Sequence, residues 1–183
     1  MANCEIELMA HLMRRAGFGS TRQELEERVA VGYQETIDSL LDEDSPDDVD
    51  IYEFWRYFNY QWKPGTLGGI GQSGWVWRMI NTRTPLREKM TIFWHQIFAT
   101  GVSKVDHNDE ITDMIVMFRH KGMGNYKDLL IDLCKCPAMI YWLDNNENHN
   151  GAPNENFGRE LLELFSMGVG MDSHENYTED DVK

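Results

Sequence analysis

The sequence has few basic residues for its length. Lysine and arginine number 17 against 31 aspartates and glutamates, which gives a formal net charge of −14 at pH 7. Such a charge repels a phosphate backbone or an anionic membrane surface unless a local basic patch opposes it. The basic residues form only short clusters, such as Arg14 and Arg15. We therefore expect no nucleic-acid partner.

Long hydrophobic runs and paired cysteines are also lacking. No segment approaches the ~18 consecutive apolar residues of a membrane-spanning helix, so no transmembrane segment is expected. The acidic start of the chain has no basic region followed by an apolar one, and therefore does not resemble a signal peptide. Three cysteines form no disulfide framework and suit a reducing compartment. These features leave the compartment open, with the cytoplasm as the default expectation.

Large apolar side chains, in contrast, are abundant. Hydrophobic residues make up 42% of the chain, with 6 tryptophans, 8 phenylalanines and 11 methionines, a composition that a disordered chain would not have. The 183 residues fit one domain, and a chain of this size buries roughly 70% of its unfolded surface. We expect a single helical domain over residues 1–183.

The apolar residues recur mostly at helical spacing, which predicts an all-α fold, an irregular multi-helix bundle. The clearest helix spans residues 85–100. It begins at Thr84 and Pro85, typical helix-start residues, and its apolar stripe comprises Met90, Phe93, Trp94, Ile97 and Phe98. Thr21 and Glu24 have the spacing of a capping box and predict a second helix start. No strand–turn–strand pattern stands out.

Three segments are predicted to be flexible loops, near residues 42–50, 63–74 and 144–153, because they are rich in acidic residues, glycine or asparagine. The aromatic-rich segment 51–62 is predicted to be a helix. Another helix begins at Asn154 or Asn156 and runs through Met167, before Gly168.

The end of the sequence looks like the beginning of another helix. Residues 178–181 read Thr-Glu-Asp-Asp, a typical helix start, but only two residues follow. We therefore expect an incomplete domain, truncated at its C-terminus, whose partners would include the missing C-terminal part of its own chain.

Several stretches resemble the bacterial family called domain of unknown function 1800. The match opens with His11-Leu-Met-Arg-Arg-Ala-Gly-Phe-Gly19 and is strongest over Gly151-Ala-Pro-Asn-Glu-Asn-Phe-Gly-Arg-Glu-Leu-Leu-Glu-Leu-Phe165. Further matching segments are 84–95, 98–100, 124–130, 137–139 and 177–182. Gly158 departs from the family, which usually has alanine there.

The resemblance implies a helical fold and no particular reaction. It also implies a parent protein considerably longer than this chain. Members of the family are often exported and often encoded beside a sulfatase-like family, so a sulfatase-like protein is a candidate partner.

Three residues are candidates for a catalytic or metal site. His95 lies at the edge of the apolar stripe of the 85–100 helix, and Glu160 and Glu163 share one face of their helix because they are three residues apart. Carboxylates from one helix and a histidine from another are how helical bundles bind divalent metals. The alternatives are a structural, half-buried His95 and surface ion pairs of Arg159 with Glu155 and Glu163.

Two further groups are candidates for ligand binding. Arg14 and Arg15 could bind an anion, although arginines at a helix C-terminus more often neutralise the helix dipole. Asn154, Glu155, Asn156 and Arg159 lie at the start of a helix, where Glu155 could orient a ligand, but asparagine at this position is usually a helix cap.

Two functions of different classes remain open. Because the sequence contains no complete catalytic motif, the first is an interaction or structural role for this fragment. The alternative is part of a metal-assisted hydrolase or oxidoreductase, with its site between helices 85–100 and 154–167. Whether the chain is an enzyme stays open.

Overall fold

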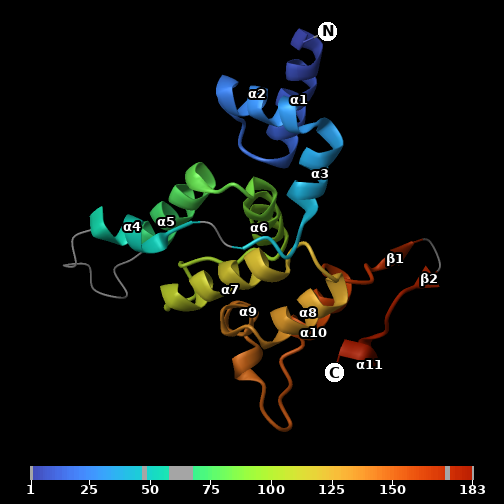
Figure 1. Ribbon diagram of the computed structural model, residues 1–183. Helices are drawn as coiled ribbons and strands as arrows, with labels where there is room; N and C mark the ends of the chain where they lie inside the picture. Colours follow the sequence, from blue (N-terminus) through green and yellow to red (C-terminus); the bar gives the residue numbers. More distant parts are fainter. Residues whose placement is uncertain (1, 47–48, 58–67, 172–173, 183) are drawn as a thin grey trace.

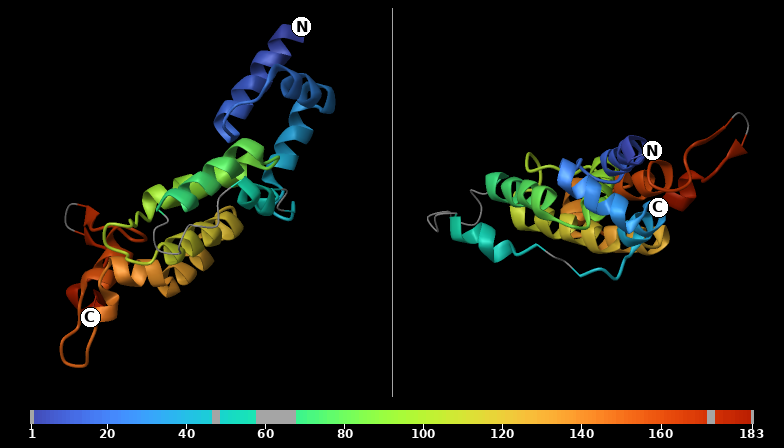
Figure 2. Two further views of the ribbon diagram at one scale, coloured as in Figure 1. Left: turned by 90° about the vertical axis from the view of Figure 1, so that its left-hand side faces the viewer. Right: turned by 45° about the horizontal axis from the view of Figure 1, so that its top comes forward.

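The computed structural model describes residues 2–46, 49–57, 68–171 and 174–182, and in these ranges the chain is mostly helical. Figure 1 shows a group of helices at the N-terminal end, a central group of helices, and a C-terminal part with a small hairpin. The views in Figure 2 show that these parts follow one another along an elongated molecule. The expected all-α class is confirmed.

The first three helices form a small unit with its own apolar cluster. They are α1 (Ala2–Ala16), α2 (Arg22–Val31) and α3 (Tyr33–Leu41). The predicted capping box at Thr21 is present, since Thr21 Oγ1 accepts from the backbone N–H of Glu24 and the Glu24 carboxylate accepts from the backbone N–H of Thr21. The apolar cluster that these helices form with one another comprises Met9, Met13, Leu25 and Leu40.

The central group surrounds helix α6 (Pro85–Ile97), which begins at Pro85 as predicted. Its neighbours are α4 (Ile51–Tyr57), α5 (Gly68–Asn81) and α7 (Asn108–Lys121). Helix α6 packs along α7, and α5 contacts both. These three helices position the candidate site.

The C-terminal part consists of shorter elements. They are α8 (Tyr126–Lys135), α9 (Pro137–Trp142), the 3₁₀ turn η1 (Asn145–Glu147), α10 (Asn156–Glu163), the antiparallel strands β1 (Gly170–Met171) and β2 (His174–Glu175), and α11 (Glu179–Val182). Asn125 is the N-cap of α8, and its side chain accepts from the backbone N–H groups of Lys127 and Asp128.

Aromatic rings join the central and C-terminal parts. Trp94 of α6 stacks on Phe98 and on Tyr126, with ring centroids 5.5 Å apart in each pair. Phe98 is completely buried and meets Phe165 edge to face at 5.0 Å. The Trp94 indole also donates to the carbonyl oxygen of Gly122. Of the apolar stripe predicted on α6, Trp94 and Phe98 therefore belong with the main core, whereas Phe93 and Ile97 are 46 and 40% exposed. The helix predicted over residues 85–100 ends at Ile97.

Three sequence predictions are corrected here. The loop predicted over 63–74 is wrong for residues 68–74, because α5 begins at Gly68; residues 63–67 lie outside the described ranges. The helix predicted to run through Met167 ends at Glu163. A short hairpin occurs where no strand pair was expected. For the helix predicted over 51–62, α4 covers 51–57, and 58–62 lie outside the described ranges.

In the described ranges, no helix is both long and apolar enough to cross a membrane, as the sequence predicts.

Candidate functional site

His95 of α6 lies against α5, where it meets the Trp75 indole edge to face with ring centroids 5.6 Å apart. The Nδ1 atom of its imidazole is buried and has no hydrogen-bond partner among the residues that the structure describes. Burial lowers the pKa of His95 below its ordinary value of 6.5, because it disfavours the charged imidazolium. The ring is therefore neutral at neutral pH, with one nitrogen that can donate and one that can accept.

His95 lines a cavity of about 210 Å³ between α5, α6 and α7. A second cavity, of about 260 Å³, adjoins it on the side of α4. The two share the lining residues Gly71, Trp75, Asn108, Thr112 and Ile115. We refer to the two together as the α5–α7 cavity. Each of the two holds space for a molecule of a few heavy atoms.

A buried ion pair forms part of the wall. Arg119 of α7 donates from Nε to Glu88 Oε1 at 2.5 Å and from Nη2 to Glu88 Oε2 at 3.2 Å. The Trp75 indole donates to the same carboxylate, at 2.9 Å from Oε2. One carboxylate therefore connects α5, α6 and α7 and fixes the tryptophan that faces His95. Such a fully hydrogen-bonded arrangement satisfies a charge that burial would otherwise penalise heavily.

Two glycines of α5 face its neighbours, and a Cβ atom at either position would make an ordinary van der Waals contact. A Cβ atom at Gly71 would lie 3.4 Å from Thr112 Oγ1 on α7, and one at Gly74 would lie 3.5 Å from the Phe54 ring on α4. Both glycines line the cavity, so larger side chains at these positions would also reduce its volume.

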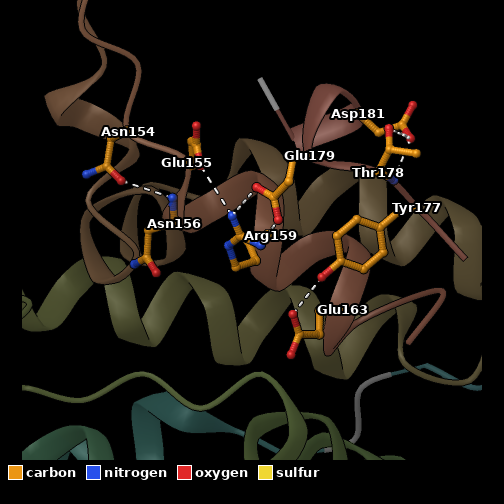
Figure 3. A network of polar contacts seen from close by, with 9 residues as sticks. All are labelled: Asn154, Glu155, Asn156, Arg159, Glu163, Tyr177, Thr178, Glu179 and Asp181. Atoms are coloured by element: carbon orange, nitrogen blue, oxygen red, sulfur yellow. Dashed lines mark hydrogen bonds and ion pairs between the residues drawn. The ribbon is translucent and has the colours of Figure 1, made fainter. Parts of the chain in front are cut away.

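A second polar network lies at the C-terminal end, and Figure 3 shows its side chains. Arg159 of α10 donates to both carboxylate oxygens of Glu179, at 3.0 and 2.7 Å, and to Glu155 at 3.2 Å. These contacts raise the pKa of Arg159 above its already high ordinary value, chiefly through its hydrogen bonds to Glu179. The Tyr177 hydroxyl donates to Glu163 at 2.6 Å, which raises the pKa of Tyr177. The segment before α11 is thereby attached to α10.

The asparagines of this network hold the preceding loop. Asn154 Oδ1 accepts from the backbone N–H of Asn156 at 3.0 Å, and the Asn154 amide donates to the carbonyl oxygen of Asp144. The Asn156 amide donates to the carbonyl oxygen of Leu143. In the structure Glu155 takes the N-cap position without a side-chain cap bond. Asn154, Glu155, Asn156 and Arg159 therefore all bond within the chain.

The predicted metal ligands have different neighbours in the structure. His95 faces Trp75, whereas Glu163 accepts from Tyr177, and Glu160 lies one helical turn before Glu163 on α10. Among the described residues, no group of three or more histidines, cysteines, aspartates or glutamates is placed to hold a metal ion. The alternative ion pair of Arg159 with Glu155 is present, and Glu179 is its second carboxylate partner.

Arg14 and Arg15 lie at the C-terminal end of α1, both exposed. This is the position at which arginine favours the helix dipole.

Three residues near His95 were not predicted from the sequence: Trp75, which meets its ring, and Glu88 and Arg119, whose ion pair holds Trp75. A signal for one of them was present: Glu88, Thr91 and His95 follow one another at helical spacing, on a face next to the apolar stripe. Thr91 is fully buried and Glu88 is 3% exposed, so this face is directed inward. Arg119 comes from a different helix, and no local pattern marks it as the partner of Glu88.

The chain matches the model of one protein family over residues 11–183, described as "Protein of unknown function (DUF1800)". It belongs to this family, in agreement with the resemblance of its motifs. No curated protein and no solved structure matches it.

Proposed function

We propose that this chain binds a small, largely apolar molecule bearing a hydroxyl group in the α5–α7 cavity. The observation that carries the proposal is that His95 lines the cavity and that its buried Nδ1 has no hydrogen-bond partner among the described residues. Buried polar atoms are nearly always hydrogen-bonded, and one that lacks a partner calls for an explanation. A bound ligand supplies the missing partner.

The lining of the cavity suits such a molecule. Trp75, Phe54, Ile115 and Val116 offer apolar and aromatic surface. The polar and charged residues of the lining are Asn108, Thr112, Arg78, Asp109 and Arg119. This combination of an apolar wall with few polar groups is typical of small-molecule sites. A hydroxyl group both donates and accepts, so it can pair with Nδ1 in either tautomer of the neutral imidazole.

The hydrogen bonds that the nearby Glu88 carboxylate already accepts favour binding over catalysis. A histidine that acts as a general base is usually oriented by a third group, often a carboxylate. Glu88 already accepts from Arg119 and Trp75. The proposal therefore assigns His95 a role in recognition.

Phenol and toluene are the probes that test this proposal, because they differ only in the hydroxyl group. We expect phenol to bind more tightly than toluene to the wild-type protein, as measured by ligand-observed NMR, and His95→Leu to remove the difference. His107→Leu is the matched control, since His107 is exposed and makes no side-chain cap bond. Equal binding of the two probes to wild-type protein would refute the assigned role of His95.

A second candidate function is docking to a protein partner, for which a sulfatase-like protein is the prediction from the resemblance. The observation that favours it is a run of exposed apolar side chains near the C-terminal hairpin: Leu164, Met167, Val169 and Met171 are 66, 50, 60 and 84% exposed. Exposed apolar patches often mark interaction sites. Changing Leu164 and Met171 to serine should abolish co-purification with the sulfatase-like protein if this surface docks it.

The metal site of His95, Glu160 and Glu163 stays a prediction, and so does the absence of a nucleic-acid partner. Elemental analysis of the purified protein beside its His95→Ala variant tests the metal site. Stoichiometric metal that is lost in the variant would support it. A filter-binding assay with duplex DNA tests the second expectation, which the net charge of −14 supports.

A further inference from the structure

A second site of different character lies on the other side of α6. A groove of about 430 Å³ is formed by the end of α1 and the turn after it, and by one face of α6. Arg15 and Phe18 line it from the first side, and Leu86, Lys89, Met90 and Phe93 line it from α6. Among the residues that the structure describes, none lines both this groove and the α5–α7 cavity.

Two cations are placed at this groove in a protein that is otherwise strongly acidic. Lys89 is held in position, because its Nζ donates to the carbonyl oxygen of Gly17 at 2.9 Å and lies 5.3 Å from the centroid of the Phe18 ring. An ammonium group has three donors, so the bond to Gly17 leaves others for a ligand. Arg15 is exposed and brings a guanidinium group to the same groove.

The rest of the groove is apolar and elongated. Leu86, Lys89, Met90 and Phe93 recur at the spacing of one helix face. From Leu86 to Gln96, which also lines the groove, α6 rises roughly 15 Å at 1.5 Å per residue. Phe18 and Phe93 are 43 and 46% exposed, so aromatic surface is open to a ligand. An extended apolar chain fits this shape better than a compact ion.

We propose that the groove binds a single-chain amphiphile with one carboxylate group, of the fatty-acid class. The carboxylate would pair with Arg15 and Lys89, and the hydrocarbon chain would lie along Met90 and Phe93. Two cations complement one anionic group, while the net charge of −14 disfavours polyanions such as nucleic acid. This proposal is independent of the function proposed for the α5–α7 cavity.

The two neighbouring arginines of α1 give a matched test. Both are exposed and carry the same charge, but Arg15 lines the groove and Arg14 does not. Decanoate is titrated by isothermal calorimetry into wild-type protein, Arg15→Gln and Arg14→Gln. Because a charge-assisted contact is lost, we expect about tenfold weaker binding to Arg15→Gln and an unchanged affinity for Arg14→Gln.

Two other ligands separate the head group from the chain. Decanol lacks the carboxylate and acetate lacks the chain, and both should bind more weakly than decanoate. His95→Leu should leave decanoate binding unchanged, which distinguishes this site from the α5–α7 cavity. The proposal is overturned if decanoate does not bind, if the two arginine variants lose affinity equally, or if decanol or acetate binds as well as decanoate.

Discussion

The carboxylate of Glu88 and the guanidinium of Arg119 are both almost fully buried, and each compensates the charge of the other. Removing one partner of such a pair leaves an uncompensated charge in the interior. We expect Arg119→Met to lower the free energy of unfolding by about 3–5 kcal/mol, measured by urea denaturation. The double variant Glu88→Leu/Arg119→Met should be less destabilised than the sum of the two single variants.

The exposed ion pair of Arg22 and Glu26 is the control for this prediction. Their side chains are 64 and 56% exposed, and exposed pairs contribute about 1 kcal/mol or less. Arg22→Met should therefore change the free energy of unfolding far less than Arg119→Met. Similar losses in the two variants would contradict the role given to the buried pair.

His95 makes stability depend on pH in a defined direction. Because burial lowers its pKa in the folded protein, the unfolded chain takes up the proton first as the pH falls below 6.5. The contribution of the neutral, buried His95 is complete above that pH and is lost progressively as the pH falls toward the folded pKa. The melting temperature of wild-type protein should therefore fall, relative to His95→Gln, only below about pH 6.5. Parallel curves for the two proteins would rule out a lowered pKa.

At the scale of single residues, the sequence revealed His95 but not its surroundings. Its place beside an apolar stripe is a local feature, and local periodicity predicts it. The packing of α5 on α6 determines which nitrogen lacks a hydrogen-bond partner. It also places Trp75 against the imidazole ring. The Arg159–Glu155 pair was predictable because both residues lie within one turn, whereas Glu179 lies 20 residues away in the chain.

At the scale of elements, α7 ends in close packing against α6. A Cβ atom at Gly122 would lie 2.6 Å from Trp94 Cδ1 and 2.4 Å from the carbonyl oxygen of Phe118. We expect Gly122→Ala to lower the free energy of unfolding by about 1–3 kcal/mol, because the Trp94 ring must shift within the core. Thermal denaturation followed by near-ultraviolet circular dichroism measures the loss.

Gly124, two residues later, is the control. A Cβ atom there would have no neighbour closer than 3.4 Å. Gly124→Ala should therefore leave stability nearly unchanged. A loss in Gly124→Ala as large as that in Gly122→Ala would show that backbone freedom, and not the approach of Trp94, determines the effect.

The attachment of α11 to α10 depends on Arg159. Arg159→Ala removes both hydrogen bonds to Glu179, so we expect faster amide hydrogen exchange in α11, with the exchange of α7 unchanged. The matched control Arg22→Ala should leave exchange in α11 as it is in the wild type. If α11 exchanges equally fast in wild type and Arg159→Ala, the ion pair does not hold it.

Gly158 belongs to the same contact. A Cβ atom at this position would lie 2.7 Å from the carbonyl oxygen of Val182. Glycine at position 158, where the resemblance leads us to expect alanine, therefore leaves room for the close approach of α11 to α10.

Helix starts were predicted better than helix ends, for a physical reason. The capping box at Thr21 and the proline at position 85 act within one turn, so the sequence alone indicates them. The start of α5 in a glycine-rich segment runs against local propensity. Its packing on α4 and α7 is a tertiary feature, which local propensity does not indicate.

At the scale of the whole molecule, two apolar clusters divide the chain. One is formed by residues of α1–α3. The other is formed by residues between Phe98 and Leu143, together with Phe165. Helix α6 connects them: Leu86 packs against the first cluster, and Trp94 and Phe98 belong with the second. Its other two faces line the α5–α7 cavity and the groove beside α1. Composition and helical periodicity predicted the fold class, but these cavities arise from packing between helices distant in sequence.

The central claim is that a ligand in the α5–α7 cavity forms a hydrogen bond with Nδ1 of His95. Its most direct test is the nitrogen chemical shift of His95 Nδ1, measured by NMR above the ordinary histidine pKa of 6.5, before and after phenol is added. We predict that phenol moves this resonance and that toluene does not, since only the hydroxyl can pair with Nδ1. A resonance that stays in place with phenol at saturation would contradict the account.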